Sequence, residues 1–117
     1  MPRLSLSAMP KVEASASVHE FSLLEGDVSV APGAMVSPGT AITADKGASV
    51  VVSDRCHLLP GVVVEAISGA QVMGDRSPCS IYLGLGSVIA HKSLIHSPAF
   101  VGAGCFVGFR STIFNAR

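Results

Sequence analysis

Two histidines five residues apart are the side chains of this chain best suited to metal or proton chemistry. His91 and His96 stand in the run Ile89-Ala-His-Lys-Ser-Leu-Ile-His-Ser-Pro. An imidazole nitrogen binds zinc well, and the ring also accepts and releases a proton near neutral pH. Most lone histidines are only hydrogen-bonded core or surface residues, but these two fall outside the inward positions described next. We therefore treat both as candidate metal-binding or catalytic residues.

The elements that position these histidines repeat every six residues. An amphipathic helix would repeat its apolar residues every three or four positions, and an exposed strand every two. A period of six predicts a parallel β-helix, in which short strands alternate with corners. The large inward residues are Leu83, Ile89, Ile95, Val101, Val107 and Ile113, and the small inward residues four positions later are Ser87, Ser93, Ala99, Cys105 and Ser111.

The same period predicts how the rest of the chain is organised. We predict a flexible leader over residues 1–17 and a hexapeptide-repeat domain over residues 18–117, with aliphatic positions starting at Val18. Four extra residues from Lys46 to Ser49 interrupt the repeat and predict a small corner loop. A second interruption adds thirteen residues and predicts a loop excursion near 67–80. Loops on a β-helix often gather on the face that binds a ligand or partner.

Glu65 is the carboxylate that the repeat aligns with His96. Each residue stands one position after an aliphatic one, Val64 or Ile95, and the two lie 31 residues apart. Without the thirteen extra residues the separation is eighteen, which is one triangular coil of three hexapeptides. We therefore predict that Glu65 and His96 stack one coil apart on the same edge. His91 belongs to the preceding corner, so it would approach them only from a neighbouring subunit or around an edge.

Composition limits the classes of function that are open to the chain. It has 117 residues, which is enough for one domain, and its formal net charge of zero gives no basis for binding nucleic acid or an anionic membrane. No stretch predicts a secretory signal or a membrane-spanning segment, so we expect a cytoplasmic protein. The three cysteines have no metal-type spacing and are expected to be reduced. Cys56 and Cys105 occupy small inward positions, which predicts packing and not reactivity.

Three segments carry a resemblance to a known family. They are Ser80-Ile-Tyr-Leu-Gly, the run from Ile89 to Gly102 that contains both histidines, and Gly104-Cys-Phe-Val-Gly-Phe-Arg-Ser-Thr-Ile-Phe-Asn-Ala-Arg. The chain resembles γ-class carbonic anhydrases and, more narrowly, the N-terminal domains of CcmM-type scaffold proteins of β-carboxysomes. This resemblance implies a left-handed parallel β-helix that forms a homotrimer. In the family, three histidines from adjacent subunits hold zinc. We expect this chain to lack the C-terminal helix of the family.

The resemblance also predicts an altered site. His91 and His96 stand at two of the family's zinc ligands, but Glu65 stands where the third histidine is expected. Thr43 replaces the arginine that partners Asp45 across the subunit interface, and Leu59 replaces a glutamine that positions the zinc-bound solvent. We expect zinc to be absent or weakly bound. Asp45 and Glu65 remain the only candidates for a catalytic carboxylate.

The subunit interface is predicted from a second group of residues. Arg110 is a candidate for an intersubunit salt bridge with an acidic residue such as Asp45 or Asp75. Phe109 is one of several aromatic residues on outer positions of the repeat, and exposed aromatic residues gather where partners bind.

Three functions fit the sequence. The first is a degenerate, inactive carbonic anhydrase homologue that acts as a trimeric structural or docking module of a carboxysome, with other carboxysome proteins as partners. The second is an active zinc-dependent carbonic anhydrase that uses His91, His96 and Glu65, since two histidines and one glutamate form working zinc sites elsewhere. The third, with least support, is a hexapeptide acyltransferase in which one of the histidines acts as a general base.

Overall fold

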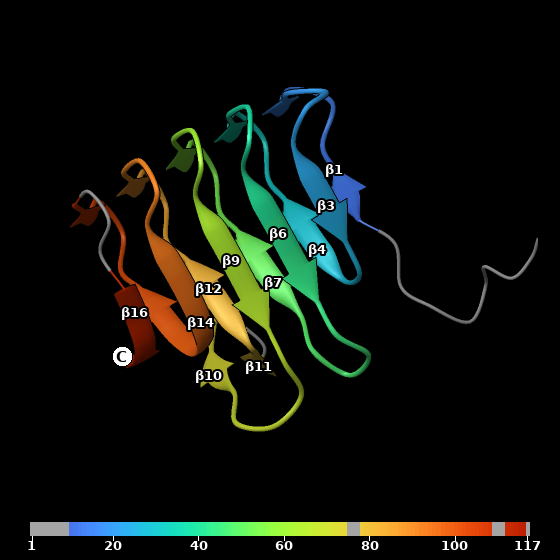
Figure 1. The fold of residues 1–117 in the computed structure, drawn as a ribbon, viewed down its shortest axis with the longest axis vertical. Coiled ribbons are helices and arrows are strands. Elements are labelled where there is room, and N and C mark those ends of the chain that lie inside the picture. The colour runs from blue at the N-terminus through green and yellow to red at the C-terminus, as the bar shows by residue number, and fades with distance from the viewer. Residues whose placement is uncertain (1–9, 75–77, 109–111, 117) are drawn as a thin grey trace, which may run out of the picture.

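The chain forms a parallel β-helix whose short strands stack in successive coils (Figure 1). The computed structural model describes residues 10–74, 78–108 and 112–116, and all regular structure in these ranges is β-strand. Each coil adds one strand to each of three faces, and the chain visits the faces in a fixed order. The predicted parallel β-helix is therefore confirmed. The described part of the chain contains no helix that could span a membrane.

The three faces take their strands in rotation along the chain. The first face holds β1 (Lys11–Val12), β4 (Val28–Val30), β7 (Val50–Val52), β12 (Ile81–Leu83) and the end of β14 (Leu94–Val101). The second face holds β2 (Ser17–Val18), β5 (Met35–Val36), β8 (His57–Leu58), β13 (Val88–Ile89) and β15 (Phe106–Val107). The third face holds β3 (Leu23–Glu25), β6 (Ala41–Ala44), β9 (Val63–Ala66), the start of β14 and β16 (Thr112–Ala116). We call the corner from the first to the second face the first edge, the next corner the second edge, and the corner that returns to the first face the third edge.

The strand registers give the length of each coil. Ser17 pairs with Met35, eighteen residues on, and Met35 pairs with His57, twenty-two residues on. His57 pairs with Val88, thirty-one residues on, and Val88 with Phe106, again eighteen. The basic coil is thus three hexapeptides, and the predicted insertions of four and thirteen residues account for the two longer coils.

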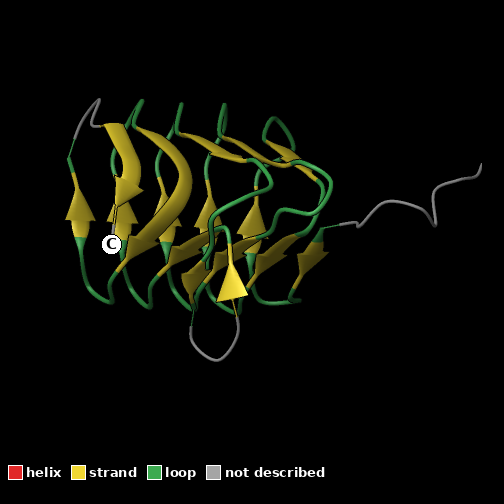
Figure 2. Ribbon diagram, turned by 90° about the horizontal axis from the view of Figure 1, so that it is seen from below, coloured by secondary structure: helices red, strands yellow, loops and turns green. Residues whose placement is uncertain are grey.

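Both insertions leave the solenoid at the third edge. The first follows β6, and the second follows β9. The second contains β10 (Val72–Met73) and β11 (Pro78–Cys79), which pair antiparallel as a separate two-stranded sheet against the side of the coils (Figure 2). The predicted loop excursion therefore contains a short hairpin, and Val72 and Cys79 on it are buried.

The solenoid begins earlier than we predicted. Lys11 of β1 pairs with Ser29 of β4, and the backbone N–H of Glu13 donates to the carbonyl of Val30 at 3.0 Å. Residues 10–17 are thus part of the first coil and not of a leader; residues 1–9 of the predicted leader lie outside the described residues. The reason is visible in the repeat, since Val12 already stands six positions before Val18. Serine- and alanine-rich neighbours hid this first repeat.

Alternation along each strand directs aliphatic side chains into the core. In β9 the pattern is half-buried, buried, exposed and buried, and the same alternation holds in β6 and β14. The largest side chains that are fully buried are Ile42, Leu58, Ile81, Leu83, Ile89 and Ile95. Burial of each such side chain contributes about 1.5–3 kcal/mol. The core is therefore a stack of similar aliphatic layers, as the six-residue period predicted.

The buried serines at small inward positions find hydrogen-bond partners. The Ser87 hydroxyl donates to the carbonyl of Gly84 at 2.8 Å and lies 3.2 Å from the Cys56 sulfur. Burial raises the pKa of the Cys56 thiol, and the hydrogen bond with Ser87 opposes this rise. The prediction that Cys105 is buried is wrong, because it is exposed. Ser87 of the next coil covers Cys56, whereas the described residues place no coil over Cys105.

Candidate functional site

A row of outward side chains crosses the third face from coil to coil. The registers place Glu25 beside Thr43, Thr43 beside Glu65, and Glu65 beside His96. We call these four residues the acidic row. Neighbouring members are separated by one strand spacing, about 4.8 Å. The predicted register of Glu65 with His96, one coil apart, is therefore confirmed, but both residues lie in strands of a face and not on the predicted edge.

The direction of Glu65 follows from its strand. Val64 and Ala66 on either side of it are buried, so the intervening side chain must point to solvent, and Glu65 is exposed. Thr43 and His96 are half-buried at the equivalent places on β6 and β14. The third face thus brings together one predicted ligand from the earlier coil and one from the later coil.

The ring of His96 is oriented by its own backbone. Its Nδ1–H donates to the carbonyl of Ser97 at 2.8 Å, because a carbonyl can only accept. Metal-binding histidines commonly make such a hydrogen bond from the ring. The Ser97 hydroxyl is also bonded to Ile67, accepting from its N–H at 2.9 Å and donating to its carbonyl at 3.4 Å. These hydrogen bonds hold Ile67, at the start of the excursion, beside the residue that follows His96.

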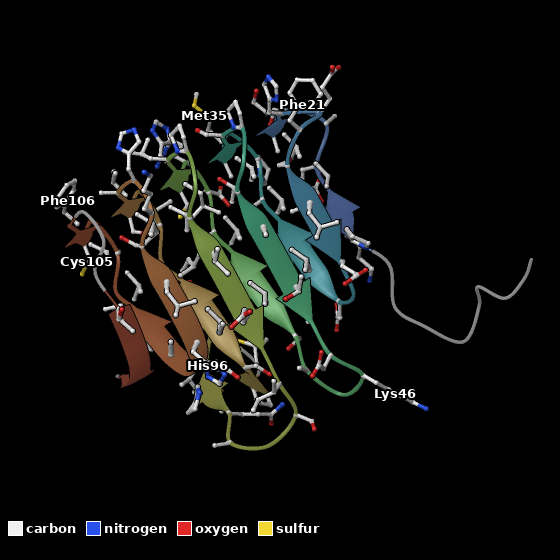
Figure 3. The ribbon with its side chains drawn as sticks, viewed as in Figure 1. Phe21, Met35, Lys46, His96, Cys105 and Phe106 are labelled. Carbon is white, nitrogen blue, oxygen red and sulfur yellow. The ribbon has the colours of Figure 1, made fainter. Side chains whose placement is uncertain are left out.

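His91 lies in a different place, on the second edge. It is exposed in the turn between β13 and β14, where the N–H of Lys92 donates to the carbonyl of Pro60 at 3.2 Å. Leu59 lies in the same region, since its N–H donates to the carbonyl of Ile89 at 2.9 Å. In Figure 3, Phe21 marks the second edge and His96 lies at the opposite end of the third face, toward the hairpin.

One chain therefore brings together only part of the predicted site. Thr43, Glu65 and His96 lie in the acidic row, whereas His91 and Leu59 lie on the second edge. Within the described ranges, no group of three or more His, Cys, Asp or Glu residues is placed to hold a metal ion. Within one chain, His91 on the second edge therefore stands apart from Glu65 and His96 in the acidic row.

The remaining predicted residues are placed as follows. Asp45 is exposed on the third edge, where its N–H donates to the carbonyl of Ala66 at 2.9 Å and its carbonyl accepts from Ala48 at 2.8 Å. Its backbone therefore shapes the inserted corner. Phe109 and Arg110 lie outside the described residues, so their roles at an interface stay predictions.

Neither of two hollows on the surface is lined by a candidate ligand. One of about 230 Å³ lies between the hairpin and the first face and is lined by Gln71, Val72, Met73 and Phe100. Another of about 450 Å³ lies at the C-terminal end of the described coils, with Val101, Val107 and Ile113 among its lining residues.

Sequence reasoning missed the stacked rings of Tyr82 and Phe100, whose centroids are 5.2 Å apart. Their positions eighteen residues apart, one coil, could have indicated the pair.

Comparison with known proteins finds carboxysome assembly proteins and, at lower identity, a carbonic anhydrase. The chain is 40% identical over 111 residues to the carboxysome assembly protein CcmM of Synechocystis and 42% identical over 111 residues to that of Synechococcus elongatus. Each match covers 94% of this chain but only 16% and 21% of the relative, respectively. A carbonic anhydrase of Methanosarcina thermophila is 28% identical over 118 residues, covering 92% of this chain and 48% of that protein. The chain thus spans less than half the length of these relatives. No protein-family model matches it.

Solved structures agree on the fold. The CcmM N-terminal domain, crystallised in complex with CcmN, superposes with a TM-score of 0.71 over 92% of this chain and 81% of that one. The sequences are 16% identical in this superposition, so it shows the fold alone. The resemblance to CcmM and to carbonic anhydrase that the motifs predicted is confirmed by the sequence matches.

Proposed function

We propose that this chain, a homologue of one segment of the CcmM carboxysome assembly proteins and a more distant homologue of a carbonic anhydrase, is a trimeric structural module of a carboxysome that has lost carbonic anhydrase activity. The observation that carries the proposal is the acidic row, in which Glu65 and not a histidine stands in register with His96. The solenoid that positions the site is intact, while the donor groups on it have changed.

The chemistry of the changed donors argues against rapid CO2 hydration. Zinc promotes this reaction by lowering the pKa of a bound water to about 7. A carboxylate ligand donates more negative charge than a neutral imidazole, so the bound water becomes a weaker acid. Thr43 beside Glu65 and Leu59 near His91 offer neither the cation nor the amide expected there. Loss of such supporting groups alone costs about 10–100-fold in metal affinity or activity.

The proposed location and partners follow from the relatives. A structural module homologous to CcmM would act inside the carboxysome of a bacterial cytoplasm and bind other carboxysome proteins. CcmN is the partner in the solved complex of the CcmM N-terminal domain, so a protein of that type is the first candidate. The neutral net charge of this chain offers no attraction for nucleic acid or membranes.

A second candidate function is zinc-dependent CO2 hydration with His96 and Glu65 from one subunit and His91 from the next. The orientation of His96 supports it, since its ring donates from Nδ1 to the carbonyl of Ser97, a second hydrogen bond that metal-binding histidines commonly make. Carboxylate and imidazole are both ordinary zinc donors, so these residues fit the ion. The zinc would supply the acidified water, and the chain's own residues would hold the ion between two subunits.

One experiment separates the two functions. We would measure zinc per chain, molecular mass and CO2 hydration rate on the same purified sample. The structural function predicts a trimer with little zinc and no hydration above background, and a robust rate would refute it. Glu65→Ala should abolish zinc and activity if the enzyme function holds, while Glu25→Ala, in the same row two coils away, serves as the control.

A restored site adds a positive test. Glu65→His combined with Thr43→Arg and Leu59→Gln returns the three groups that the γ-class resemblance predicts. A gain of zinc and activity in this variant would mean that the solenoid and its assembly kept the geometry of the site. No gain in a variant that remains a trimer would mean that the fold has also drifted.

A further inference from the structure

The third face of the solenoid combines an apolar row with the acidic row. Leu23, Ala41, Val63 and Leu94 align from coil to coil, and Leu23 is 50% exposed. The parallel acidic row carries two carboxylates, Glu25 and Glu65. Among the described residues of these two rows there is no lysine or arginine. A partner for this face therefore needs an apolar strip and a positive charge.

The second edge of the same chain carries such a charge. Lys92 has a φ of +60°, a left-handed conformation that is unfavourable for a residue other than glycine. The two preceding coils place Gly39 and Gly61 at this corner, with φ of +77° and +81°. A side chain is thus retained where the backbone favours glycine. Its stem lies over the previous coil, since a Cβ added to Gly61 would sit 3.2 Å from the Lys92 Cγ.

Lys92 and Glu65 lie at different places on the coil. Lys92 lies over Gly61 at the second edge, whereas Glu65 lies four residues further along the chain, in β9, which begins at Val63. At no more than about 3.3 Å per residue, the backbones of Gly61 and Glu65 are separated by up to about 13 Å.

We propose that the second edge of one copy docks on the third face of a second copy, with Lys92 of the first paired to Glu65 of the second. The inference rests on the proposed assembly and adds to it the contact that holds the site together. Because the two patches differ, the contact is head-to-tail and produces a closed ring when the rotation between copies closes. In this arrangement the ammonium group supplies the positive charge beside Glu65, so assembly does not depend on a metal ion. Val63 and Leu94, in the coils nearest Glu65, would be covered by the neighbour.

Charge reversal with rescue tests the contact. The single variants Glu65→Lys and Lys92→Glu are compared with the double variant. All samples contain EDTA, so that no metal ion bridges the copies. Light scattering measures the mass, and far-UV circular dichroism checks folding. Each single variant should weaken association at least tenfold by placing like charges together, and the double variant should restore it. The matched controls are Glu25→Lys in the same row and Arg55→Glu, the other left-handed cation, at the first edge. Both controls should retain the mass of the unmodified chain.

The outcomes distinguish this contact from the proposed function. If the unmodified chain assembles in EDTA and both single variants assemble equally well, the ion pair is wrong while the structural function stands. If the single variants dissociate and the double variant does not recover, the pairing of these two residues is also wrong. If the unmodified chain is a monomer in the presence and absence of zinc, both the contact and the proposed trimer are overturned.

Discussion

Replacing Leu58 with alanine, and separately its neighbour Leu59, tests the alternation on which the whole site depends. Leu58 is fully buried between Val36 and Ile89 of the adjoining coils, whereas Leu59 is half-buried on the outside. The two leucines are chemically identical and adjacent, so each is the control for the other. Any difference between them reports the direction of the side chain.

The expected magnitudes follow from burial. Leu58→Ala removes buried methyl and methylene groups and leaves a cavity between two rigid coils, which costs about 2–5 kcal/mol. Leu59→Ala removes a side chain that keeps part of its contact with water, so we expect a loss below about 1 kcal/mol. Since small domains are stable by only about 5–15 kcal/mol, the first loss is readily measured.

Urea unfolding followed by circular dichroism provides the assay. The midpoint should fall clearly for Leu58→Ala and little for Leu59→Ala, with similar slopes for both. An equal loss, or a larger loss for Leu59→Ala, would refute the reasoning. Val64 stands one hexapeptide after Leu58, so that result would also remove the argument that Val64 points inward and Glu65 outward.

Three further predictions rest on local packing and burial. Gly84→Ala should destabilise the fold strongly, because the new Cβ would lie 2.6 Å from backbone atoms of the next coil. Gly86→Ala should lower the free energy of unfolding by only about 1 kcal/mol, because Gly86 has a φ of +69° but open space around it. Thermal unfolding compares the two variants. A thiol reagent should label Cys105 quickly in the folded protein and label Cys56 and Cys79 only after denaturant is added. Burial raises the pKa of the Cys56 thiol above its ordinary value of 9.0, so the folded state favours the neutral thiol. The contribution of Cys56 to stability should therefore be complete below pH 9.0 and decline as the pH rises toward the folded pKa. Cys56→Ala should flatten this alkaline decline in melting temperature.

The repeat itself made much of the fold predictable. A parallel coil must return each inward residue to the same place, so a period of six, together with the four extra residues after Asp45 and the thirteen after Val64, predicts how β12, β13 and β15 align with the earlier coils. The same reasoning aligned Glu65 with His96 before any coordinates were known, and the pairing of β9 with β14 confirms it.

The wrong or missing predictions concern residues whose environment depends on more than the six-residue repeat. Cys105 obeys the pattern, but an inward position is buried only when another coil covers it, and that information is not in the hexapeptide itself. Val12 continues the pattern backward, yet one repeat among serines and alanines is too weak a signal. The hairpin in the excursion depends on pairing between Val72 and Cys79, which no period predicts. Whether His91 meets the acidic row depends on a second molecule, so neither one sequence nor one chain decides it.

Both insertions leave the stack at one edge, and this has a consequence for engineering the protein. The coil before each insertion and the coil after it keep their register, so added length at the third edge is absorbed without disturbing the layers. The entropy cost of lengthening a loop is about 0.6 kcal/mol for each doubling. The turn that contains Lys46, which projects from the solenoid in Figure 3, should therefore accept a foreign peptide or a reporter domain, making this chain a scaffold that can display cargo from one side.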